Sequence, residues 1–137
     1  MDYVALKNEI LTDPKTMGYA GKSDQQISDL LNTVPSVPTT IYRGLINAYE
    51  IINNTVPSEF SALAAIEQNR YLAITGAGQV DTSNANVRSA FAQMFAAGTT
   101  TRTNLSAMAI RNKYRWEELT GIDRAPSHID IAIALRG

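Results

Sequence analysis

The 137-residue chain contains no cysteine and one histidine, His128. Without cysteine it can form no disulfide, thiolate metal site or cysteine nucleophile. A single histidine excludes a metal site built from several imidazoles. No apolar run approaches the roughly 18 residues that cross a bilayer. The first ten residues, MDYVALKNEI, have acids where a signal peptide needs a basic region. We therefore expect a soluble protein made inside the cell, with no cofactor, no metal ion and no membrane contact.

Acidic residues are missing from residues 82–116, which carry five basic residues. Residues 1–81 carry nine acidic and five basic residues, and residues 117–137 carry four acidic and two basic. The basic stretch can form a face for an acidic partner or for phosphates. Alternatively, the acidic and basic segments face each other within the fold or are solvated separately. The net charge of −1 gives no general attraction to nucleic acid or anionic membranes.

The spacing of apolar residues and the placement of capping residues predict an all-α fold. We expect one compact domain over residues 1–137, a bundle of about six to eight short helices. The expected helices begin near Tyr3, at Asp24 after a Ser23 cap, after Thr39 or Thr40, at Pro57–Ser58, after Asp81–Ser83 and after Thr99; a short turn covers Trp116–Leu119, and a last helix spans residues 128–135.

Two of these helices carry most of the predicted core. Ile41, Leu45, Ala48 and Ile52 lie at i, i+4, i+7 and i+11, an amphipathic stripe. A longer helix, the longest of the chain, is expected to run from Ser58 to Gly76, where glycine ends it. The predicted core residues are Leu6, Ile10, Ile27, Leu31, Ile41, Leu45, Ile52, Phe60, Leu63, Ile74, Val87, Phe91, Met94 and Leu105.

Residues 129–135 also fit a strand, because isoleucine or leucine occupies every second position. Ser127 followed by Asp130 resembles a capping box and favours a helix instead. A lone strand would need a partner, and the sequence offers no second good strand. The helix is our prediction, and the strand remains open as an alternative.

No group of residues predicts catalysis. Ser127, His128 and Asp130 are the residue types of a hydrolase triad, but neighbours in sequence cannot converge as a triad must. Glu117 and Glu118 diverge by about 100° on a helix, so they share no proton or metal. The segment 71–78 resembles a strand entering a dinucleotide loop but lacks the third glycine and a surrounding βαβ pattern. We therefore expect no enzyme.

The clearest candidate contact surface is basic and aromatic. Arg111, Lys113, Tyr114 and Arg115 precede Trp116, and Arg102 lies on the preceding predicted helix. Such a composition suits protein interfaces, where Arg, Tyr and Trp are enriched. It also suits phosphate contact combined with base stacking. A third interpretation is that Trp116 anchors a short helix in the core.

Three stretches together resemble a known group of proteins. They are Leu6–Pro14 with Gly18-Tyr19-Ala20-Gly21 and Ser23-Asp24, then Gly98–Leu105, and then Arg115–Gly121. In this order they are similar to small proteins of tailed bacteriophages and prophages. Those begin with an LKxEL-TDP-xxxGYAG stretch and end with an SRAEELG-like stretch and a short helix. The chain departs from that pattern at Tyr114-Arg115-Trp116, where a small residue and alanine are usual, and in its Pro35/Pro38 linker.

The resemblance implies a phage protein and transfers no catalytic residue. We expect a non-enzymatic structural protein, a small virion subunit at the head–tail junction, tail or capsid, assembled in the host cytoplasm. Its expected partners are other virion proteins and further copies of itself. The alternative is a non-structural accessory protein that binds a host factor or nucleic acid.

Overall fold

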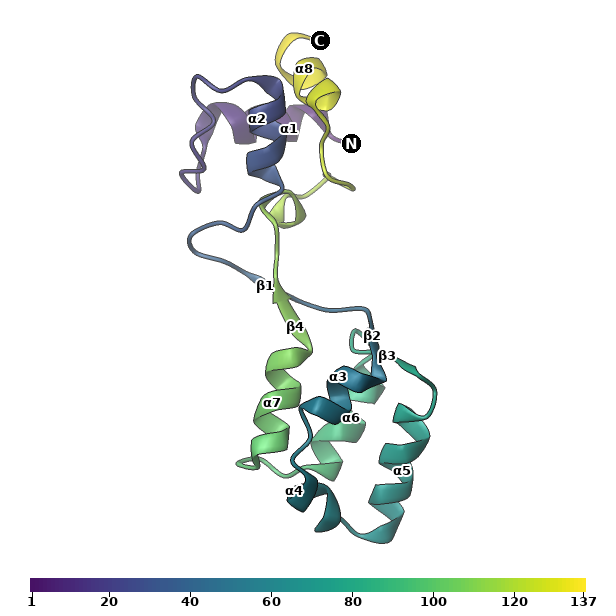
Figure 1. Cartoon of the computed structure of the whole chain (residues 1–137). Coiled ribbons are helices and arrows are strands. Elements are labelled where there is room, and N and C mark those ends of the chain that lie inside the picture. The colour runs from purple at the N-terminus through teal and green to yellow at the C-terminus, as the bar shows by residue number, and fades with distance from the viewer. The chain divides into compact units, whose positions relative to one another are not determined.

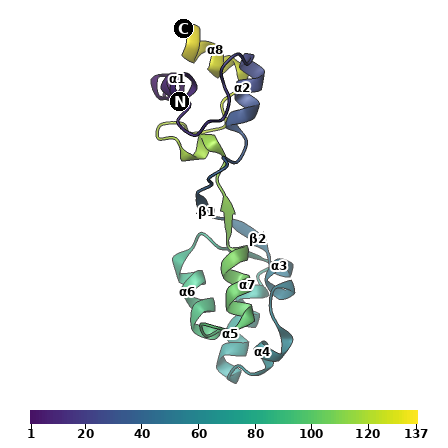
Figure 2. The ribbon, with the colours of Figure 1, turned by 90° about the vertical axis from the view of Figure 1, so that its left-hand side faces the viewer.

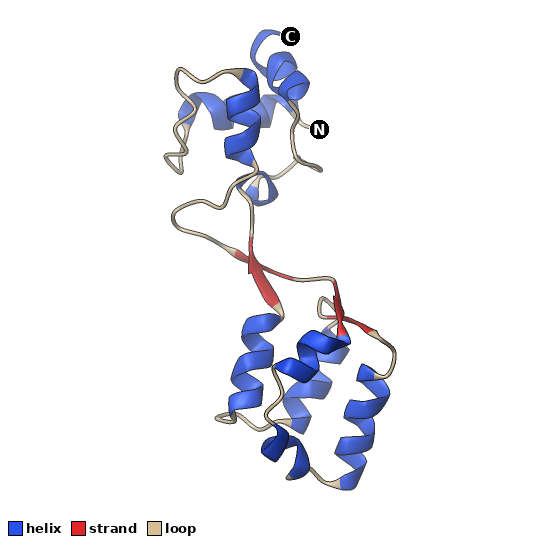
Figure 3. Cartoon of the chain, in the orientation of Figure 1, coloured by secondary structure: helices blue, strands red, loops and turns tan.

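The computed structural model describes all residues 1–137 (Figure 1). Helices hold 53% of the residues, and four short strands form two small antiparallel sheets (Figure 3). The prediction of an all-α fold is therefore wrong, because the fold is helix-rich but mixed. The elements are α1 (Tyr3–Thr12), α2 (Asp24–Leu31), β1 (Thr40–Tyr42), β2 (Leu45–Asn47), α3 (Ala48–Asn53), α4 (Pro57–Ser61), α5 (Ala65–Thr75), β3 (Gln79–Asp81), α6 (Ala85–Met94), α7 (Thr100–Met108), β4 (Ile110–Asn112), the 3-10 helix η1 (Arg115–Glu118) and α8 (His128–Arg136).

The chain divides into two compact units. Unit 1 comprises Met1–Thr40 and Asn112–Gly137, and unit 2 comprises Ile41–Arg111. Unit 2 is thus inserted in the sequence of unit 1, and each unit has its own cluster of buried apolar side chains. β1 pairs with β4, and the boundary between the units falls within these two strands. The sequence predicts one domain over residues 1–137, and that the chain unfolds as one domain stays a prediction.

In unit 1, side-chain caps place the helices as the sequence predicts. The Asp2 carboxylate accepts hydrogen bonds from the first-turn amides of α1. Ser23 forms a capping box at the start of α2, and Ser127 forms another at the start of α8. The first, second and last predicted helices are confirmed, and the strand alternative for 129–135 is wrong.

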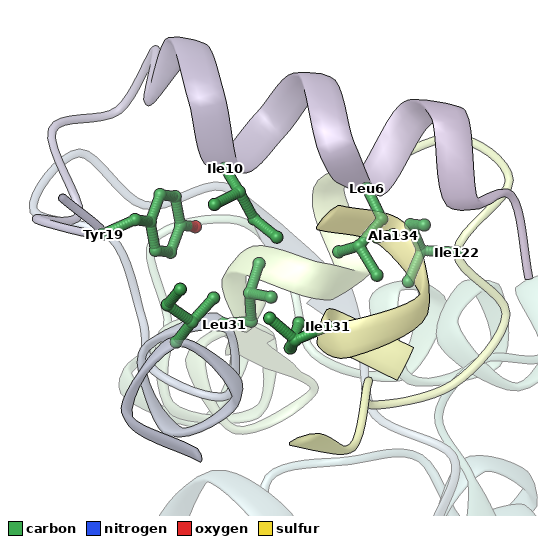
Figure 4. Close-up of a cluster of buried hydrophobic side chains, with 8 residues drawn as sticks. Leu6, Ile10, Tyr19, Leu31, Ile122, Ile131 and Ala134 are labelled. Carbon is green, nitrogen blue, oxygen red and sulfur yellow. The ribbon is translucent and has the colours of Figure 1, made fainter. Parts of the chain in front are cut away.

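Helix α8 packs against both α1 and α2. Ile131 is fully buried, whereas Ile129 is 58% exposed, as the 100° turn per helical residue requires. Figure 4 shows Leu6 and Ile10 of α1 directed toward Ile131 and Ala134 of α8. The three helices therefore enclose one core, which is mainly aliphatic and includes the ring of Tyr19.

The loop between η1 and α8 closes against the N-terminus at Gly121. The Gly121 carbonyl accepts a hydrogen bond from the Asp2 amide at 2.9 Å. Its φ of +83° favours glycine, and a Cβ there would lie 2.8 Å from the Cβ of Asp2. Glycine is needed at this position for both reasons.

The helix predicted after Thr40 is wrong over its first half. Residues 40–42 form β1, and Leu45–Asn47 form β2, which pairs antiparallel with β3 so that Ile46 faces Val80. Helix begins only at Ala48, after an Asn47 cap. Gly44 disfavours a helix here, and pairing with β3 buries Ile46 instead of Leu45, which is 68% exposed.

The long helix predicted from Ser58 to Gly76 is two helices. α4 ends at Ser61, and α5, the longest helix, begins at Ala65. The Gln68 side chain donates hydrogen bonds to the carbonyls of Phe60 and Ser61. This side chain satisfies acceptors at the end of α4 that a continuous helix would have used internally.

An aromatic cluster is part of the core of unit 2, where α5, α6 and α7 lie (Figure 2). Tyr71 of α5 contacts Phe60, Phe91 and Phe95 at ring-centroid distances of 5.0, 6.2 and 6.2 Å. The two contacts with Phe91 and Phe95 are edge-on, the arrangement that aromatic quadrupoles favour. This cluster joins α4, α5 and α6.

Most of the predicted core residues are buried or partly buried. Leu6, Ile10, Ile27, Leu31, Met94 and Leu105 are buried. Phe60, Leu63, Ile74, Val87 and Phe91 are partly buried against the core of unit 2. Ile41, Leu45 and Ile52 are exposed, which corrects their assignment to the core.

Candidate binding pocket

The basic residues singled out from the sequence occupy different environments. Arg102 and Arg111 belong to unit 2, whereas Lys113, Tyr114 and Arg115 belong to unit 1. Arg111 is exposed, and Tyr114 is 40% exposed and precedes η1. Lys113 is half-buried, and its amide donates to the Thr39 carbonyl.

Arg115 is buried in unit 1, with 6% of its surface exposed. Its Nε and Nη2 donate to the two carboxylate oxygens of Glu9, each at 2.7 Å. The Tyr19 hydroxyl donates to the same carboxylate at 3.0 Å. The hydrogen bond to Glu9 raises the pKa of Arg115, and burial raises the pKa of Tyr19 far above its usual range. Arg115 is therefore a structural residue, and its place among the contact residues needs correction.

A second ion pair holds the start of α8. Arg124 donates to both oxygens of Asp130, at 2.6 and 2.8 Å, and the Ser127 amide donates to the same carboxylate. The Tyr3 hydroxyl also donates to Asp130. The Arg124 hydrogen bonds hold the pKa of Asp130 well below its usual range. Ser127 and Asp130 thus cap a helix, as the sequence predicts.

A pocket of about 280 Å³ opens in unit 2, between α6, α7 and the segments beside them. Ile51 and Leu105 are its buried apolar walls, and Phe91 adds a half-buried ring. Tyr42 and Ile110 line it with partly exposed apolar surface. The lining is therefore mainly apolar, as in most ligand sites.

Two arginines supply the positive charge of this pocket, Arg88 from α6 and Arg102 from α7. The Arg88 guanidinium lies 3.6 Å from the centroid of the Tyr42 ring, and its Nη1 donates to the Thr82 carbonyl at 2.9 Å. Nη1 of Arg102 donates to the carbonyls of Ala92 and Phe95, at 3.0 and 3.1 Å. These contacts fix both side chains without neutralising them.

Neither Arg88 nor Arg102 has a carboxylate within 4.0 Å. A guanidinium has five N–H donors, and in both residues only Nη1 has a protein acceptor. The remaining donors can bind an anionic group presented at the pocket. By contrast, Arg43 in the same unit pairs with Glu50 at 2.9 Å.

The sequence predicted Arg102 as an interaction residue but missed Arg88 and Tyr42. Both lie outside the basic-aromatic cluster that ends at Trp116. Tyr42 comes from β1, a segment whose sequence predicts a helix. The acid-free stretch 82–116 contains both pocket arginines, and this absence of acids is the signal that could have found Arg88.

No group of three or more His, Cys, Asp or Glu residues is arranged to hold a metal ion. None of the helices combines the length and apolar character needed to span a bilayer. No family model matches the chain, and neither a curated protein nor a solved structure is significantly similar to it.

Proposed function

We propose that this chain is a non-enzymatic structural protein of a tailed bacteriophage, a small virion subunit that acts by protein–protein contacts. The head–tail junction, the tail and the capsid surface are its candidate positions. Its partners are other virion proteins, with further copies of the chain as a second kind of neighbour.

The observation that carries the proposal is the pocket of unit 2. It combines buried apolar walls with an arginine stacked on a tyrosine and a second arginine that has no carboxylate partner. Arginine and tyrosine beside a desolvated apolar pocket are the usual composition of interface hot spots.

The phage setting is supported by the resemblance of three stretches of sequence. Two of them supply residues to one buried network, because Glu9 and Tyr19 lie in the first stretch and Arg115 in the third. Asp13, also in the first stretch, has a φ of 42° and accepts hydrogen bonds from the amides of Met17 and Gly18. The first and third stretches therefore contribute to the fold of unit 1, whereas the second, Gly98–Leu105, contributes Arg102 and Leu105 to the pocket of unit 2.

Burial of Arg115 weakens the nucleic-acid alternative. The guanidinium of Arg115 is bound by Glu9, so it is removed from the basic cluster that would have contacted phosphates. A protein that depends on phosphate contacts uses several exposed cations, and its affinity falls steeply with salt. We therefore favour a protein partner.

Mass spectrometry of purified particles tests the proposal. The phage or prophage that carries this sequence is induced, and particles are separated from the lysate on a density gradient. We expect peptides of the chain to remain with the particles in amounts comparable to known virion proteins. A non-structural phage protein from the same lysate is the control and should be lost. Recovery of the chain only from the particle-free lysate would contradict the proposal and favour a host-directed accessory protein.

A further inference from the structure

The pocket of unit 2 combines two kinds of surface within one small volume. Its walls at Ile51 and Leu105 are buried and apolar, which favours an apolar side chain. Arg88 and Arg102 present N–H donors that no protein carboxylate occupies. A ligand that satisfies both features carries an apolar group and an anionic group close together.

The volume indicates the size of that ligand. Small-molecule sites usually measure roughly 300–1,000 Å³, and this pocket of about 280 Å³ lies just below that range. It accommodates one or two amino-acid side chains more readily than a whole cofactor. The partly exposed Tyr42 and Ile110 at its lining leave the pocket accessible to a chain that continues past it.

The anion is better matched by a carboxylate than by a nucleic-acid backbone. Two arginines can hold one or two carboxylates through bidentate hydrogen bonds. A nucleic-acid backbone would place many phosphates along a surface, whereas the pocket has only two arginines beside apolar walls. The apolar walls would then be left without a partner.

We infer that this pocket binds an acidic, apolar peptide segment of a partner protein. One large aliphatic or aromatic side chain of that segment packs against Ile51 and Leu105. Neighbouring Asp or Glu side chains accept hydrogen bonds from Arg88 and Arg102. The inference rests on the proposed function, because it names the chemistry of the partner that a protein-binding subunit would recognise.

A random peptide display library, selected on the immobilised full-length chain, identifies the preferred ligand. We expect the enriched peptides to combine an aromatic or aliphatic residue with Asp or Glu within a few positions. Enrichment of basic peptides, of purely apolar peptides or of none would overturn the inference. Displacement of the enriched peptide by an equal concentration of a DNA oligonucleotide would overturn it as well.

Binding of one enriched peptide, measured by fluorescence anisotropy, then tests the residues. Arg88→Gln and Arg102→Gln should each weaken binding at least about tenfold, because a paired charge in a desolvated site is lost. Arg70→Gln is the matched control, since Arg70 lies in unit 2 outside the pocket and contacts Gln93 and Glu67. Equal affinity of all three variants would overturn the inference.

Arg102 also binds carbonyls at the end of α6, so its loss can disturb the fold. Ser106→Trp provides an independent test, because Ser106 is exposed and lines the pocket. This substitution fills the pocket without removing a charge and should also abolish peptide binding. Retained binding by a folded Ser106→Trp variant would overturn the assignment of the ligand to this pocket.

The outcome is separable from that of the virion proposal. A chain that remains in purified particles but binds no acidic peptide keeps the proposed function and loses this inference. A chain that binds acidic peptides through Arg88 but is absent from particles loses the virion role alone.

Discussion

The two units use their arginines differently. In unit 1, Arg115, Arg124 and Arg136 each pair with a carboxylate, Glu9, Asp130 or Asp24. In unit 2, Arg88 and Arg102 donate to backbone carbonyls and line a pocket. The comparison shows that the role of an arginine depends on whether a carboxylate contacts it. In unit 1 these three arginines are paired within the fold. In unit 2 Arg43 and Arg70 are paired as well, but Arg88 and Arg102 remain available for a ligand.

The largest expected effect comes from breaking the buried ion pair of unit 1. Glu9→Gln removes the bidentate counter-charge of the buried Arg115 and leaves only Glu118 at 3.8 Å, which should cost about 3–5 kcal/mol of unfolding free energy. Urea titration followed by fluorescence of Trp116, the only tryptophan, measures it in unit 1. The double variant Glu9→Gln/Glu118→Gln should lose more than the single one, because it also removes the second carboxylate beside Arg115. A single-variant loss under about 1 kcal/mol would contradict a structural role for the pair.

The second prediction asks whether the units unfold separately. Phe95→Ala removes a buried ring from unit 2 and should cost about 3–5 kcal/mol there. Because each unit has its own core, the unfolding transition seen by Trp116 should stay in place while that seen by circular dichroism shifts. A parallel shift of both signals would instead support the single domain expected from the sequence.

The third prediction concerns acid and unit 1. Since Arg124 lowers the pKa of Asp130 in the folded chain, the folded state binds fewer protons than the unfolded state. The resulting contribution of Asp130 to the free energy of unfolding is fully present above the ordinary carboxylate pKa. It is lost as the pH falls below about 4. The urea concentration at the midpoint of the Trp116 signal should therefore be lower at pH 3 than at pH 6. Asp130→Asn should reduce that difference, and an identical pH dependence in the variant would contradict the argument.

The smallest effect is expected on the exposed side of α8. Ile129→Ala should change the stability by no more than about 0.5 kcal/mol, because the side chain is 58% exposed. Ile131→Ala, two positions away, should cost about 2–5 kcal/mol. In a strand both residues would lie on one face, so equal losses in urea titrations would contradict the helix.

Local signals in the sequence predicted the capped helices. Ser23, Thr99 and Ser127 bond to amides within three residues, so their role is visible in a short window. The strands were missed because β2 gains its hydrogen bonds from β3, in which Val80 faces Ile46 across 34 positions. The apolar stripe from Ile41 to Ile52 fits a helix locally, and only this distant pairing overrides it.

The site was predicted only in part, again because contacts between residues distant in sequence decide it. The sequence places Arg115 in a basic-aromatic cluster, but its bidentate partner is Glu9, 106 positions away. Arg102 was singled out from its acid-free surroundings and does line the pocket. Arg88 shares those surroundings, yet its stacking on Tyr42 depends on a strand that the sequence analysis did not expect.

The most direct test is incorporation of Arg88→Gln into particles, compared with Arg70→Gln and the unchanged chain. Both substitutions remove one positive charge from unit 2, but only Arg88 lines the pocket. Circular dichroism should show both variants folded. The account predicts that Arg88→Gln is depleted from purified particles while Arg70→Gln is retained at the level of the unchanged chain. Equal incorporation of the two folded variants would contradict the claim that unit 2 keeps its pocket arginines for a partner.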